Sequence, residues 1–156
     1  MKLSVKNAKD LELTKLIKLA ANFYSEILLD ENIINDLILT ITIQKTNAIE
    51  SGVCLTDDKD PARKFNIEIA RFRKKSLMLR ILAHEMVHLK QYAYNELYEH
   101  DLKTYWHGKV INVMYWDQPW EIEAYGLENG LFAKFINKYD LFKQLNERRS
   151  AWSMDW

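Results

Sequence analysis

Apolar residues recur every three or four positions in three long stretches of the chain, which is the spacing of one face of an α-helix. The stretches run from about residue 9 to 29, from about 76 to 94 and from about 120 to 139. Pro119, just before the third stretch, suits the first turn of a helix, because that turn does not need its backbone N–H. The pattern therefore predicts three helices.

Three shorter stretches have the composition of β-strands. Residues 37–43 are rich in β-branched side chains, and residues 53–56 form a short apolar run. Residues 65–69 alternate between apolar and polar side chains, which predicts a half-buried strand, and we expect it at an edge of the sheet. Turn and loop residues occupy 47–52 and 57–61. The segment 101–116 is aromatic and irregular, and we expect a hairpin around Gly108.

The order of these elements predicts the fold class. An N-terminal helix, a group of strands and two further helices indicate an α+β protein with a small three-stranded sheet. The 156 residues are enough for one domain with a substantial core, and four glycines and two prolines leave few places for a linker. We expect a single domain over residues 1–156, with a loosely packed tail from about residue 148.

Composition narrows the setting and the partners. Lys plus Arg and Asp plus Glu both number 22, so no overall charge drives the chain onto nucleic acid or anionic lipid. Cys54 is the only cysteine, which excludes an intrachain disulfide and favours a reducing compartment. The lysines near Met1 are not followed by an apolar run, and no apolar run is long enough for a membrane span. We expect a cytoplasmic protein with no membrane partner.

An HExxH sequence, His84 to His88, lies within the second predicted helix. Residues four apart stack one helical turn above each other, so the His84 and His88 imidazoles can bind one metal ion. Glu85 reaches past the metal toward a water in the open coordination position. A zinc ion lowers the pKa of such a water to about 7, and a carboxylate can then take its proton. This order of residues predicts a catalytic Zn²⁺ site with Glu85 as general base.

Catalytic zinc usually has three protein ligands, and the sequence offers two candidates for the third. Glu121 lies in the first turn of the third helix, on the face that also carries Ala124 and Glu128. Ala124 is small enough for close helix packing, and Glu128 can support a ligand imidazole. His107 lies in a glycine-containing aromatic loop, a less rigid platform. We expect Glu121 to complete the site, and we interpret Glu123 only as an acid that offsets the helix dipole.

A longer pattern resembles a known family. The HExxH helix, the Trp106-x-Gly108-Lys109 segment and the run from 115 to 124, which contains Pro-Trp-Glu-x-Glu-Ala, are similar to small SprT-like metallopeptidases often encoded by bacteriophages. The resemblance covers roughly residues 75 to 130. It implies a minimal zincin-like fold, bound zinc and peptide hydrolysis.

The sequence departs from one branch of that family at the third ligand. In the cellular SprT and Spartan branch, this ligand is a His followed by Gly. His107-Gly108 has that pair, but it lies further from His88 than expected and lacks the usual residues after it. The spacing of Glu121 and Ala124 is instead similar to the third-ligand element of Glu-zincins and ImmA-like peptidases.

Two further features bear on the chemistry. Six aromatic residues lie between the two predicted metal-binding helices, where they either form the core under the site or line the substrate cleft. If they line the cleft, we expect the hydroxyl of Tyr125, or else that of Tyr115, to stabilise an oxyanion. Basic residues gather before the HExxH helix, and we favour a solvated face over a site for a phosphate backbone. The aromatic residues are Tyr105, Trp106, Tyr115, Trp116, Trp120 and Tyr125, and the basic ones are Arg63, Lys64, Arg71, Arg73, Lys74, Lys75 and Arg80.

The sequence thus predicts a zinc-dependent endopeptidase that acts on protein or peptide substrates, which an edge strand holds in extended form. One alternative is a DNA-associated protease of the Spartan kind. Another is a zinc-stabilised binding or regulatory module without catalysis. The sequence leaves the oligomeric state open.

Overall fold

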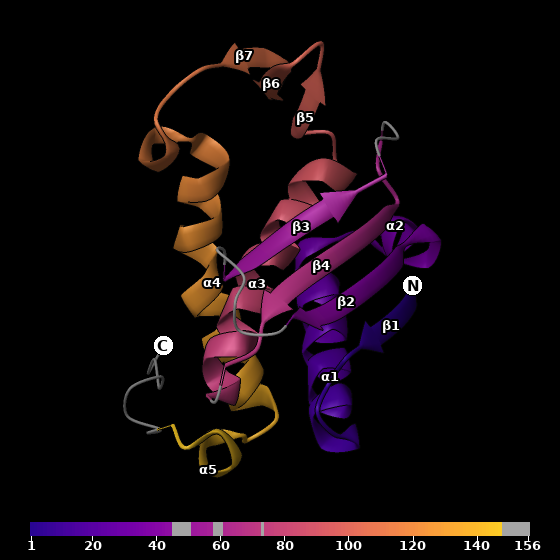
Figure 1. The fold of residues 1–156 in the computed structure, drawn as a ribbon, viewed down its shortest axis with the longest axis vertical. Coiled ribbons are helices and arrows are strands. Elements are labelled where there is room, and N and C mark those ends of the chain that lie inside the picture. The colour runs from indigo at the N-terminus through magenta and orange to yellow at the C-terminus, as the bar shows by residue number, and fades with distance from the viewer. Residues whose placement is uncertain (45–50, 58–60, 73, 148–156) are drawn as a thin grey trace.

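A four-stranded sheet with helices against one face forms the centre of the protein (Figure 1). The computed structural model describes residues 1–44, 51–57, 61–72 and 74–147. The strand order is β1 (Lys2–Lys6), β2 (Ile38–Gln44), β4 (Lys64–Ala70) and β3 (Gly52–Thr56). The first three strands are parallel, and β3 pairs antiparallel with β4. The free outer edge of β3 is therefore one border of the sheet.

The alternation of side chains decides which face of the sheet the helices cover. In β2 and β4 every second side chain is buried, and the residues between them are half-buried and polar. The half-buried polar side chains lie on the opposite face of the sheet and form hydrogen bonds between strands. Thr42 Oγ1 donates to Asn66 Oδ1 at 3.1 Å, and Gln44 Nε2 donates to Glu68 Oε2 at 2.7 Å. The buried side chains are Leu39, Ile41, Ile43, Phe65, Ile67 and Ile69.

Three long helices complete the core. They are α1 (Leu11–Leu28), α3 (Lys75–Ala93) and α4 (Pro119–Lys138). Asp10 caps α1 by accepting a hydrogen bond from the Leu13 backbone N–H at 2.7 Å. Buried aromatic side chains of α1 and α4 meet beside α3, where the rings of Tyr24 and Phe135 lie 5.7 Å apart. Two short helices, α2 (Glu31–Asp36) and α5 (Phe142–Leu145), follow α1 and α4.

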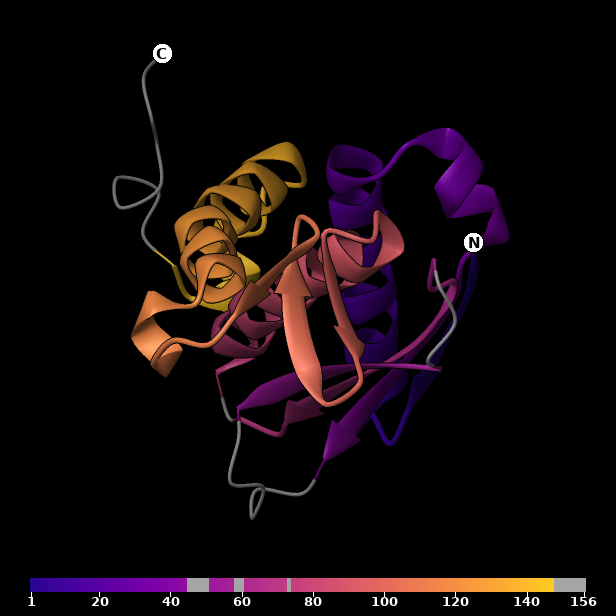
Figure 2. The same cartoon turned by 90° about the horizontal axis from the view of Figure 1, so that it is seen from above.

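A second, smaller sheet follows α3 at its C-terminal end (Figure 2). Its strands are β5 (Leu97–His100), β6 (Lys103–Trp106) and β7 (Lys109–Ile111), paired antiparallel in that order. The hairpin expected around Gly108 is present between β6 and β7, and the φ of +76° at Gly108 is one that glycine adopts at little cost. A 3₁₀ turn, η1 (Tyr115–Asp117), leads from β7 into α4.

The α+β class is confirmed, but two expectations about the sheet were wrong. The main sheet has four strands instead of three, because Lys2–Lys6 adds a strand whose short alternating pattern is flanked by lysines. Residues 65–69 do not form an edge, because β4 lies between β2 and β3. Alternation reports one buried face of a strand and carries no information about its neighbours. Residues 47–50 of the expected turn, residues 58–60 of the expected loop and the expected tail from 148 lie outside the described residues.

Over the part of the chain that the structure describes, none of the helices combines the length and the hydrophobicity that a membrane span requires.

Candidate metal centre

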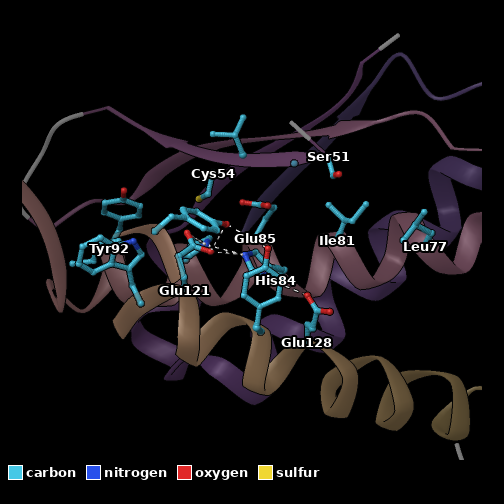
Figure 3. Close-up of a pocket in the computed structure, with 16 residues that line it drawn as sticks. Ser51, Cys54, Leu77, Ile81, His84, Glu85, Tyr92, Glu121 and Glu128 are labelled. Carbon is cyan, nitrogen blue, oxygen red and sulfur yellow. Dashed lines mark hydrogen bonds and ion pairs between the residues drawn. The ribbon is translucent and has the colours of Figure 1, made fainter. Parts of the chain in front are cut away.

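The two histidines of the HExxH sequence meet on one face of α3. Both side chains are buried, and their Nε2 atoms lie 3.1 Å apart (Figure 3). The four-residue spacing accounts for this, because it places the second imidazole one turn above the first. Both rings turn the same nitrogen toward the same point.

Glu121 on α4 supplies a third donor at that point. Its Oε2 lies 3.4 Å from His84 Nε2, and its Oε1 lies 3.4 Å from His88 Nε2. Ala124, on the same helix face, is fully buried and leaves room for α4 to pack closely on α3. One ligand atom from each of the three residues lies within 4.8 Å of the others, so the cluster is close enough to bind a metal ion.

The separations are short enough for all three residues to face one ion. Donor atoms held tetrahedrally about 2.0–2.1 Å from one ion are about 3.3–3.4 Å from each other. The two imidazole nitrogens lie 3.1 Å apart, and each lies 3.4 Å from a different oxygen of Glu121. The Glu121 carboxylate therefore faces both histidines, with one oxygen toward each.

His107, the alternative third ligand, is not part of this cluster. It is exposed in the turn between β6 and β7, and its ring packs against Trp106 with 4.5 Å between centroids. Its backbone N–H donates to the Glu96 carbonyl at 2.7 Å. The structure brings Glu121, and not His107, to the two histidines.

Glu128 orients His84 through the other ring nitrogen. Its Oε2 lies 3.1 Å from His84 Nδ1. A carboxylate only accepts hydrogen bonds, so this contact favours the tautomer with the proton on Nδ1 and a lone pair on Nε2. The sequence-based expectation that Glu128 supports a ligand imidazole agrees with this position.

Gln91 orients His88 in the same way, although no role was predicted for this residue from the sequence. Its Oε1 lies 2.8 Å from His88 Nδ1. Its Nε2 donates to the Trp120 carbonyl at 3.0 Å and to Glu123 Oε2 at 2.8 Å. Because both amide protons are used by acceptors, the amide oxygen must face the imidazole. His88 therefore also carries its proton on Nδ1 and directs a lone pair into the cluster.

The interpretation of Glu123 as an acid that only offsets the helix dipole was wrong. Glu123 accepts hydrogen bonds from Gln91 and, at 3.1 Å, from Lys90 Nζ. These bonds fix the Gln91 amide, which is fully buried. The position of Gln91 three residues after His88, on the same helix face, is the one signal in the sequence that points to it.

Two tyrosines surround Glu121. The Tyr115 hydroxyl donates to Glu121 Oε2 at 2.9 Å, and the Tyr125 hydroxyl lies 3.4 Å from that of Tyr115. The Tyr125 ring packs edge-on against His84, with 4.6 Å between centroids. Burial and the hydrogen bonds to Tyr125 and Glu121 raise the pKa of Tyr115, so its proton stays in place to donate.

The electrostatics of the cluster favour a bound cation. Burial lowers the pKa of His84, but hydrogen bonds with Glu121 and Glu128 and the charge of Glu85 outweigh it and raise this pKa to about 9. Burial raises the pKa of Glu121, but its hydrogen bonds with both histidines and Tyr115 bring the pKa well below its usual range. Without a metal, His84 therefore holds a second proton at neutral pH. A divalent cation would displace that proton and offset the negative charge of the three carboxylates around the imidazoles.

The carboxylate of Glu85 lies on the other side of the cluster, toward β3 (Figure 3). A Cβ atom added to Gly52 would lie 2.6 Å from Glu85 Oε1, so the strand backbone passes directly over the carboxylate. Glu85 and the three clustered residues line one cleft of about 570 Å³. Ser51 and the first residues of β3, Gly52 to Cys54, line the cleft, and so do Tyr115 of η1 and Tyr125 of α4.

Most of the basic residues that lie before α3 or in its first turns form hydrogen bonds or ion pairs with other residues of the protein. These contacts explain the cluster of positive charge without a bound phosphate. Arg73 lies outside the described residues. The contacts are those of Arg63 with the Ala93 carbonyl, Arg71 with the Asn7 carbonyl, Lys74 with Glu147, Lys75 with Glu12 and Arg80 with Asn129.

We compared the chain with models of protein families, with curated proteins and with solved structures, and none of the three comparisons gave a match.

Proposed function

We propose that the protein is a zinc-dependent metallopeptidase in which His84, His88 and Glu121 bind the metal and Glu85 acts as general base. The convergence of the three donor atoms beside the Glu85 carboxylate, in an open cleft, is the observation that carries the proposal. We also propose that the protein belongs to the SprT-like family and has a minimal zincin-like fold, with a glutamate as the third metal ligand.

The donor set supports zinc as the metal. Two neutral imidazoles and one carboxylate, with a position left open, are a common arrangement for catalytic zinc, whereas Ca²⁺ and Mg²⁺ prefer oxygen ligands. Each of the three residues also has a hydrogen-bond partner that orients it: Glu128, Gln91 and Tyr115. Such partners typically change metal affinity 10- to 100-fold when removed.

The residues around the metal position have separate tasks in peptide hydrolysis. Zinc, when bound, would polarise the substrate carbonyl and lower the pKa of a water molecule. Glu85 accepts the proton of the attacking water and returns it to the leaving amine. The Tyr125 hydroxyl, at the rim of the cleft beside His84, donates to the oxygen of the carbonyl as negative charge develops there.

The free edge of β3 is suited to hold the substrate backbone, a role that the sequence had given to residues 65–69. The Ala70 N–H donates to the Ser51 carbonyl, so the backbone N–H and C=O of Ser51 point toward β4. In an antiparallel pair, successive residues point these two groups alternately toward the partner strand and away from it. The backbone N–H and C=O groups of Gly52, Cys54 and Thr56 therefore point away from β4. An extended peptide can add to this edge as a further strand.

Hydrolysis of a peptide library by the zinc-loaded protein, followed by mass spectrometry, tests the proposal. The wild type should cut a defined set of peptides, and the Glu85→Gln variant should bind one zinc per chain but cut none. Equal cleavage by both proteins would rule out Glu85 as the base. Full zinc content without cleavage by either protein would instead favour a binding module without catalysis.

A further inference from the structure

A second cavity lies beside the cleft, along the same strand edge. It has a volume of about 730 Å³ and shares Val53, Cys54, Tyr92 and Leu97 with the lining of the cleft. Its outer wall comes from β5 and the turn to β6, residues 97–102. The cleft and the second cavity therefore form one groove, with β3 along its length.

The position of β3 fixes the distance between the second cavity and the reacting atoms. Gly52 lies against Glu85, and Thr56, at the other end of the strand, lines the second cavity. Strands advance about 3.3 Å per residue, so Leu55 and Thr56 are roughly 10–13 Å along the strand from Gly52. A peptide that adds to this edge places the side chains two to four residues from the cut bond beside the second cavity.

The charge of the second cavity selects the side chain that it can hold. Glu99 and Asp101 line it, and among the described residues that line it there is no Lys or Arg. His100 also lines it, with Nε2 at 3.3 Å from Asp101. Tyr92 and Tyr98 offer aromatic surface for an alkyl stem and a cation. The pKa of Tyr92 is raised, mainly by burial and to a smaller extent by nearby acidic groups, among them Cys54 and Glu99.

We infer that the second cavity binds a Lys or Arg side chain of the substrate, two to four residues on the N-terminal side of the bond that is cut. Antiparallel pairing, the commoner and more stable arrangement, runs the substrate from the Thr56 end of β3 to the Gly52 end. The residues that precede the cut bond then lie at the second cavity. This inference rests on the proposed function, because it assumes a polypeptide substrate in the cleft.

The test uses peptides that are identical except for Arg, Gln or Glu at one of these positions. We expect the wild type to cut the Arg peptide with a kcat/KM about three- to tenfold above that of the Glu peptide at low salt, because two exposed carboxylates each contribute modestly. The preference should shrink in 0.5 M NaCl, since salt screens exposed charges. Binding of the same peptides to the Glu85→Gln protein, followed by fluorescence anisotropy, should give the same order.

A charge-altered variant with a matched control makes the assignment specific. Glu99→Lys with Asp101→Asn should abolish or reverse the preference; asparagine is chosen because Asp101 has a φ of 50°, which Asn tolerates. Glu31→Lys with Asp36→Asn makes the same change of charge on exposed positions of α2 and should leave the preference unchanged.

The outcomes separate this inference from the proposed function. Cleavage without a basic preference, a preference on the C-terminal side, or an equal effect of the control variant would overturn the inference and leave the peptidase proposal standing. If no peptide is cut, the anisotropy measurement with the Glu85→Gln protein still tests the inference. Tighter binding of the Arg peptide, lost when Glu99→Lys is added, would support a basic side chain in the second cavity. Equal binding of all three peptides would overturn the inference.

Discussion

Gly52 lies on β3 directly over the carboxylate of Glu85, and the variant Gly52→Ala tests whether that carboxylate must stay where it is. An alanine Cβ at this position would lie 2.6 Å from both Glu85 Oε1 and Ile81 Cγ2. Ordinary van der Waals contact begins at 3.4 Å, so either the strand or both Glu85 and Ile81 must move by about 0.8 Å. The three clustered residues have no part in this contact.

The magnitude follows from the size of that shift. A misplacement of about 1 Å at a reacting group can lower a rate by about 100-fold, or roughly 2.7 kcal/mol. We expect kcat/KM for a cleaved peptide to fall by about 30- to 100-fold. The stability should fall by about 1–3 kcal/mol, because the Glu85 carboxylate is the flexible end of its side chain but Ile81 Cγ2 is bonded to the Cβ atom of a stiff, β-branched side chain.

The assay compares three quantities in Gly52→Ala and in a matched glycine variant. Gly130→Ala on α4 is the control, because an added Cβ there meets no atom within 4 Å. That change should leave hydrolysis intact and stabilise the helix by about 0.5–1 kcal/mol. Zinc content, measured by elemental analysis, should stay close to wild type in both proteins, and the thermal midpoint of Gly52→Ala should fall by roughly 2–4 °C per kcal/mol of lost stability.

Full activity in Gly52→Ala would contradict this prediction, because hydrolysis would then not depend on the observed position of Glu85. Loss of zinc together with activity would also contradict it, since the strain should reach the base and leave the ligands in place.

The remaining predictions concern the metal ligands. Removal of zinc by a chelator should lower the thermal midpoint, because metal at 1,000 times its Kd stabilises the folded state by about 4 kcal/mol; an unchanged midpoint after verified removal would count against the site. Glu121→Ala should lose most of its zinc affinity and His107→Ala almost none, as measured by competition with a chromophoric chelator, and the reverse pattern would assign the third ligand to His107. Gln91→Leu should weaken zinc binding about 10- to 100-fold and cost about 2–4 kcal/mol of stability in denaturant unfolding, because His88 Nδ1 and the Trp120 carbonyl lose their partner; wild-type affinity in this variant would show that Gln91 does not orient His88.

Local periodicity made the helix with the HExxH sequence predictable. His84 and His88 are four residues apart on a helix, and this spacing alone brings their side chains together. Glu121, Ala124 and Glu128 share a face of α4 for the same reason, so the sequence could indicate which side of that helix meets the histidines. These relations depend only on the geometry of one helix at a time.

The sheet shows where such reasoning ends. Alternation in residues 65–69 predicted a strand, but its place between β2 and β3 depends on pairing with residues 9 to 26 positions away along the chain. The free edge therefore belongs to β3, and the strand beside the cleft differs from the one expected from the pattern.

The pattern of residues was thus enough to predict the long helices, the α+β class and Glu121 as the residue that joins the two histidines. The folded structure was needed to show that Glu121, and not His107, does lie beside them, that Gln91 and Glu123 orient His88, and that β3 carries a groove with a second cavity. The difference comes from the range of the interactions. Backbone hydrogen bonds of a helix join residues four apart and leave a periodic trace in the sequence, whereas strand order and buried polar contacts join distant segments through packing, which leaves none.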